Sequence, residues 1–95
     1  MAEYTFDGKQ FRRSQDNTLM GEIDGNYIRD ANYSQKGQID GNYIRDASYN
    51  IIAQVDGDYI RDANNNQIGT VYNVQNIIDG PGGPSLVALW VLFIR

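Results

Sequence analysis

The stretch that decides the fold is residues 23–31, IDGNYIRDA, because it returns along the chain with the same spacing. Residues 39–47 repeat it unchanged and residues 55–63 repeat it as VDGDYIRDA, at a step of 16 residues. A degenerate copy, FDGKQFRR, occupies residues 6–13, and the pattern stops near Val71. An array of repeats commonly ends in an atypical unit. The sequence therefore predicts four units, at about residues 6–22, 23–38, 39–54 and 55–70.

Each unit reads as two short strands joined by turns. Asp-Gly between apolar residues is a strong signal for a two-residue hairpin turn, and Tyr-Ile-Arg alternates as strands do. Polar segments such as 32–35 and 64–66 indicate the second turn, followed by returning strands at 36–39, 52–55 and 68–71. Short strands at regular spacing favour an all-β barrel or sandwich.

Turn geometry predicts which side chains share a face. With Asp24-Gly25 as the loop, Ile23 lies opposite Asn26 and Gly21 lies opposite Ile28, so these four share one face. The predicted inner wall is aliphatic and consists of Ile23, Ile28, Ile39, Ile44, Val55 and Ile60, with Gly21, Gly37 and Ala53 as small residues that permit close approach. The opposite face is an outer ring of Tyr27, Arg29, Tyr43, Arg45, Tyr59 and Arg61, whose arginines could be neutralised by the adjacent Asp30, Asp46 and Asp62.

The C-terminal residues form a separate apolar tail. The Gly/Pro-rich linker 79–84 breaks the pattern, and residues 85–95 read SLVALWVLFIR. Nine consecutive apolar residues span about 14 Å as a helix, too short to cross a bilayer. A strand is also compatible with these residues, but Ser85 suits a helix N-cap. A segment that is apolar all round is buried all round, so we expect a helix, Trp90 included, that plugs the centre of a barrel.

The repeated unit, Asp-Gly-x-Tyr-Ile-Arg-Asp-Ala, together with the hydrophobic end, resembles the bacterial four-fold β-flower proteins. The resemblance covers roughly residues 4–71 and 86–94. It implies a shallow closed barrel of four hairpins, similar to tubby-like and scramblase-like barrels, in which a hydrophobic helix fills the channel. It also implies association with lipid or a membrane, and it brings no catalytic residues. The expected fold is thus a single all-β domain over residues 1–95, a closed barrel with a C-terminal helix in its centre.

Composition and charge exclude several classes of function. The chain contains no cysteine and no histidine, so thiolate and imidazole metal ligands and the commonest general base are absent. Asp24-Gly25-Asn26 and Asp56-Gly57-Asp58 read as turns rather than calcium loops, because the further ligands of such loops are missing. The net charge of −4, without a basic stripe, argues against nucleic-acid binding. Identical groups in every unit argue against catalysis, which needs unlike groups in unlike environments. We expect that the protein is not an enzyme and that it binds no cofactor and no metal.

Three hypotheses of function remain open from the sequence. The first is a non-catalytic binding module whose apolar channel, lined by the inner wall and Trp90, engages lipid or a hydrophobic peptide. The second is a structural module that self-associates, and the third is carbohydrate binding by the outer ring. Residues 1–7, MAEYTFD, show no signal-peptide pattern. The default expectation is therefore a cytoplasmic protein with no transmembrane segment. This expectation is compatible with peripheral contact with a membrane.

Overall fold

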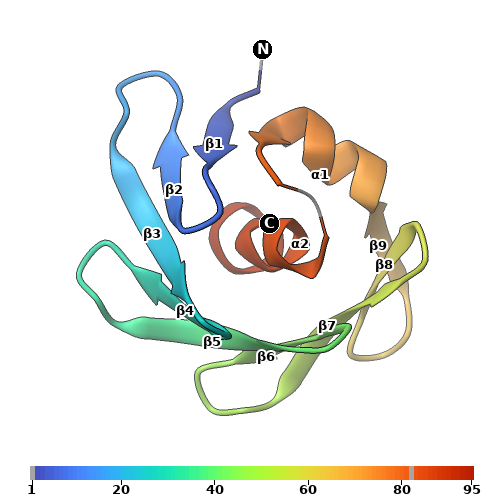
Figure 1. Ribbon diagram of the computed structural model, residues 1–95. Coiled ribbons are helices and arrows are strands. Elements are labelled where there is room, and N and C mark those ends of the chain that lie inside the picture. Colours follow the sequence, from blue (N-terminus) through green and yellow to red (C-terminus); the bar gives the residue numbers. More distant parts are fainter. Residues whose placement is uncertain (1, 82) are drawn as a thin grey trace.

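Ten strands form a single curved sheet around a central helix in the computed structural model, which describes residues 2–81 and 83–95 (Figure 1). Along the sheet the order is β10-β1-β2-β3-β4-β5-β6-β7-β8-β9, so neighbours in sequence are neighbours in space except at β10. The strands are β1 Tyr4–Phe6, β2 Gln10–Arg13, β3 Leu19–Asp24, β4 Tyr27–Asp30, β5 Gln35–Asp40, β6 Tyr43–Asp46, β7 Ile51–Asp56, β8 Tyr59–Asp62, β9 Gln67–Thr70 and β10 Ile78–Asp79.

The hairpins β3–β4, β5–β6 and β7–β8 have equivalent registers, with Ile23 opposite Ile28 in the first of them. The two-residue loop is therefore Gly25-Asn26, and the predicted loop Asp24-Gly25 is wrong by one residue. Gly25 has a φ of 64°, which a type II′ turn needs at its first loop position. The shift moves each partner by two residues, so each strand keeps the same face inward. Asn26, predicted inside, is exposed in the loop.

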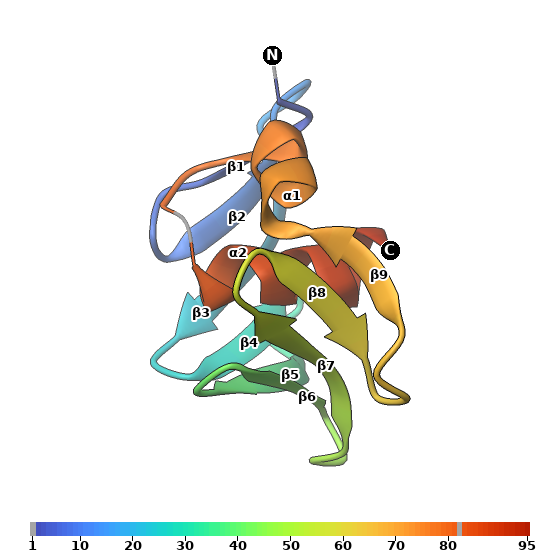
Figure 2. The ribbon, with the colours of Figure 1, turned by 90° about the vertical axis from the view of Figure 1, so that its right-hand side faces the viewer.

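The remaining hairpin connections contain an irregularity that bends the sheet. The register shifts at Ile28/Arg29 between β4 and β5, and equivalent shifts occur between β2 and β3, β6 and β7, and β8 and β9. An extra residue on one strand increases local twist and curvature. Recurring at every second strand pair, these shifts curve the sheet around the helix (Figures 1 and 2).

The sheet is open, so the predicted closed barrel is not confirmed. Within the described residues no ladder joins β9 to β10, and α1, Val71–Ile77, lies between these two ends (Figure 1). The strand pattern ends because Thr70 caps this helix, its Oγ1 accepting a hydrogen bond from the backbone N–H of Asn73 at 3.1 Å. After α1 the chain pairs β10 with β1 in parallel. Neither α1 nor β10 is predicted from the sequence.

The C-terminal segment is a short helix in the centre of the curved sheet (Figures 1 and 2). It comprises α2, Pro84–Leu89, and a π-helical turn, η1, Trp90–Ile94. The N-cap is Gly83, with a φ of 98°, and not Ser85 as predicted. Pro84 accounts for this start, because proline is favoured at the first helical position. Asp79 belongs to β10, so the predicted linker 79–84 begins too early, and its Gly82 lies outside the described residues.

Candidate binding surfaces

The predicted inner wall lies against the central helix. Its members Ile28, Ile44 and Ile60 are fully buried, Ile23 is buried, and Ile39 and Val55 are half-buried. Residues 86–89 of α2 are also fully buried and belong to the same hydrophobic core. The interior that the sequence predicts as an apolar channel is therefore filled by the chain's own helix.

Burial decreases along the central helix toward its C-terminal end. Trp90 and the other residues of η1 are half-buried, whereas the last four residues of α2 are inaccessible. Leu92 and Phe93 line a hollow of about 360 Å³ together with β3 side chains and the β4–β5 loop. The sequence predicts that residues 86–94 are buried all round, and this prediction is wrong for the accessible end, residues 90–94. An apolar run has no polar face to show where its cover ends.

Glycines of the sheet make room for η1. A Cβ on Gly21 would lie 2.7 Å from Cζ of Phe93, and one on Gly69 would lie 3.2 Å from the indole of Trp90. Gly37 stands in the same relation to Leu92. At these three glycines of the repeat, side chains of η1 therefore come close to the backbone of the sheet.

The outer ring is on the solvent side of the sheet. Tyr27, Tyr43 and Tyr59 are 45%, 41% and 47% exposed. Each arginine pairs with the aspartate five residues before it, as in Arg45 Nε to Asp40 Oδ2 at 3.2 Å; the other pairs are Arg61–Asp56 at 3.2 Å and Arg29–Asp24 at 4.0 Å. The ring is thus a repeated set of exposed tyrosine and charge-balanced arginine.

The aspartates that follow the arginines have another role than the predicted neutralisation. Oδ1 of Asp46 accepts hydrogen bonds from the backbone N–H groups of Ser48 and Asn50, both at 2.9 Å. Asp30 and Asp62 make equivalent contacts in their own loops. The pKa of the Asp46 carboxyl is lowered, and the hydrogen bond from the Asn50 backbone N–H is the largest cause. These carboxylates hold the loops in shape.

Two further tyrosines, which the sequence does not predict as part of a site, lie beside the ring. Tyr33 and Tyr49 are 65% and 58% exposed, and both have a φ of 71°. The guanidinium carbon of Arg45 lies 4.4 Å from the ring centroid of Tyr49, and that of Arg29 lies 5.3 Å from the ring of Tyr33. Comparison of the repeat units could have found them, because the equivalent positions hold Asn17 and Asn65.

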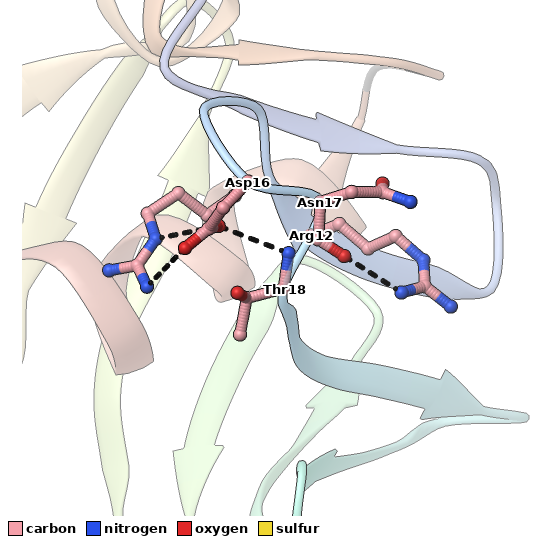
Figure 3. Close-up of polar contacts among 5 residues, drawn as sticks. Arg12, Asp16, Asn17 and Thr18 are labelled. Carbon is pink, nitrogen blue, oxygen red and sulfur yellow. Dashed lines mark hydrogen bonds and ion pairs between the residues drawn. The ribbon is translucent and has the colours of Figure 1, made fainter.

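The β2–β3 loop carries a separate polar cluster, shown in Figure 3. Asp16 accepts a hydrogen bond from the Thr18 backbone N–H at 3.2 Å and pairs with Arg13 Nη2 at 3.1 Å. Arg12 Nη1 donates to the carbonyl of Asn17 at 3.0 Å (Figure 3). The Arg13 guanidinium, followed by the Thr18 contacts, lowers the pKa of Asp16 to about 2.

Arg13→Ala is expected to raise the pKa of Asp16 toward its ordinary value, 3.8, because the guanidinium is the main cause of the depression. A depressed carboxyl stabilises the fold above its unfolded pKa, and this contribution is lost as pH falls through the folded pKa. The loss therefore belongs to the window between about 4 and 2. Carbon-detected NMR titration of Asp16 measures the shift, with Arg12→Ala as the control. An unchanged Asp16 titration in Arg13→Ala would contradict the assignment.

The described residues offer neither a metal-binding cluster nor a membrane-spanning helix. In residues 2–81 and 83–95, no three aspartate, glutamate, histidine or cysteine residues gather in a way that could hold a metal ion. None of the helices described here has the length and apolar character needed to span a bilayer.

Comparisons with known proteins give no indication of function. The chain matches no family model, no curated protein and no solved structure at a significant level. The two candidate features are therefore the central helix with its accessible end and the outer face of the sheet.

Proposed function

We propose that the chain is a non-catalytic binding module that takes up a lipid acyl chain at the accessible end of its central helix. In this proposal the four repeat units form a ring that α1 completes, and the acyl chain displaces part of η1 from the apolar wall. The resemblance to the β-flower proteins supports this proposal, because it implies association with lipid or a membrane. The proposal includes no catalytic residue, metal or cofactor.

The observation that carries the proposal is the change of burial along the C-terminal segment. Residues 86–89 are fully buried, whereas Leu92 and Phe93 line a surface hollow. A half-covered apolar end leaves surface that an acyl chain could cover at a gain of roughly 25 cal/mol for each Å². Displacement of η1 would then expose to the ligand the part of the wall around Gly21, Gly37 and Gly69, which the η1 side chains cover.

Trp90 provides a direct test, because it is the only tryptophan in the chain and belongs to η1. We expect the protein to co-sediment with phosphatidylcholine vesicles and brominated acyl chains to quench Trp90 fluorescence. Neutral vesicles are the appropriate probe, since a net charge of −4 is repelled by anionic surfaces. Tyr72→Ser, on the exposed side of α1, is the matched control and should bind equally. The absence of both co-sedimentation and quenching would refute the proposal.

A second candidate, self-assembly, rests on β9. This strand ends the sheet, and within the described residues no other strand pairs with its outer edge. Unpaired edges invite pairing with another copy. Light scattering across a wide concentration range tests the candidate, which a strictly monomeric mass would eliminate.

A further inference from the structure

The outer face carries two clusters, each of one arginine and two exposed tyrosines. In one, Arg45 lies over the ring of Tyr49 and shares the outward face of β6 with Tyr43. In the other, Arg29 lies over the ring of Tyr33 and shares the outward face of β4 with Tyr27. The next unit keeps the first tyrosine and the arginine but has Asn65 in place of the second tyrosine. The clusters are thus confined to the middle of the array.

The second tyrosine of each cluster occupies a backbone conformation that its side chain disfavours. Tyr33 and Tyr49 have positive φ values, in the left-handed region where asparagine is enriched and bulky residues are rare. At the equivalent positions Asn17 and Asn65 have φ values of 60° and 68°. Burial does not compensate the tyrosines, because both rings are mostly exposed. Backbone strain of this kind at an exposed site indicates that the tyrosine side chain has a function.

Arg45, the arginine of the first of these clusters, is held by hydrogen bonds and balanced in charge. Arg45 Nε pairs with Asp40 at 3.2 Å, and its Nη1 donates to the carbonyl of Tyr49 at 3.0 Å. Cross-strand pairing places Gln54 opposite Tyr43 and Gln38 opposite Arg45, which adds amide groups to the same face. The face therefore combines aromatic rings with fixed hydrogen-bonding groups and little net charge. These properties complement a neutral polyol rather than an anion.

The spacing of the three tyrosines that start the strands is compatible with an extended ligand. Tyr27, Tyr43 and Tyr59 start β4, β6 and β8, and one strand lies between each pair. Two ordinary strand separations make about 9–10 Å at the backbone. This length is close to that of two pyranose rings in an extended chain, so alternate sugars could stack their apolar C–H faces on successive tyrosines.

We propose that the outer face of β4–β8 is a binding site for an extended, neutral, β-linked polysaccharide. Tyr27, Tyr43 and Tyr59 would stack on sugar rings, Tyr33 and Tyr49 would border them, and the arginines and glutamines would bind hydroxyl groups. The site is independent of the lipid proposal, because it uses the opposite face of the sheet from the central helix.

Affinity electrophoresis in gels that contain hydroxyethyl cellulose tests this site. We expect the native chain to be retarded and the double variant Tyr33→Asn/Tyr49→Asn to bind about tenfold more weakly or not at all. Asparagine occurs naturally at both equivalent positions, so the variant should fold and melt at an equal or higher temperature. Tyr72→Asn, 70% exposed on α1, should bind as the native chain does.

Three results would overturn the site. One is the absence of retardation of the native chain, and another is equal retardation of the double variant. The third is retardation by dextran sulfate but not by the neutral polymer, which would show ionic attraction instead. A thermal melt of each variant, monitored by circular dichroism, establishes that a loss of retardation comes from the surface and not from unfolding.

Discussion

Leu89→Ala is expected to lower the free energy of unfolding by about 2–5 kcal/mol, because the wall and the central helix share one core. Leu89 is fully buried at the end of α2. Its truncation removes apolar contacts and leaves a cavity that the surrounding sheet can only partly fill. Domains of this size have a total stability of about 5–15 kcal/mol, so the loss is a large share of it.

Leu92→Ala is the matched control for this prediction. Leu92 is three residues further along the same segment and is only half-buried. Urea unfolding followed by far-ultraviolet circular dichroism should show a clearly smaller loss for Leu92→Ala than for Leu89→Ala. Equal losses, or a larger one at Leu92, would contradict the change of burial on which the account of the central helix depends.

Gly37→Leu is expected to destabilise the protein by overpacking, at a cost of about 1–3 kcal/mol. A Cβ at this position would lie against the backbone carbonyl of Arg45 and 3.0 Å from Cδ1 of Leu92. The carbonyl belongs to the neighbouring strand β6, so relief of the contact requires the sheet or the helix to move.

Gly69→Leu provides a graded comparison. There the nearest atoms to a Cβ belong to the Trp90 side chain, at 3.2 Å, and a side chain can shift more easily than a strand. Thermal unfolding should therefore show a larger decrease for Gly37→Leu than for Gly69→Leu. Ala53, fully buried at the equivalent position of β7, indicates that the wall accepts one small side chain. If neither glycine variant changes stability, the assignment of the inner wall is wrong.

The faces of the hairpins could be predicted from sequence because they depend only on alternation. The sequence predicts the loop one residue early, at Asp24-Gly25, yet the predicted common face of Ile23 and Ile28 is correct. The exact loop could not be deduced, since Asp-Gly and Gly-Asn are both turn-forming pairs. That Arg29 does not pair with Asp30 could have been deduced, because neighbouring residues of a strand point to opposite faces. Its partner in the structure is Asp24.

Closure of the sheet could not be predicted from the repeats. Whether β9 meets the first strand depends on the chain after Thr70, where the repeat has ended. Val71, Val74 and Ile78 recur at helical spacing, and the structure buries the last two. That signal covers barely two turns, and the two-residue pairing of β10 with β1 has no pattern of its own. The strained tyrosines were detectable only by comparing Tyr33 and Tyr49 with their asparagine counterparts.

Hydrogen exchange at the amides of residues 88–93 tests the central claim, that the sheet and the C-terminal helix form a single cooperative core. The account predicts that, without ligand, the amides of Ala88 and Leu89 are protected as strongly as that of Ile44 in the middle of the sheet. All three residues are fully buried in the same hydrophobic core. Much faster exchange in the helix, with the sheet still protected, would mean that the helix opens independently and would contradict the claim.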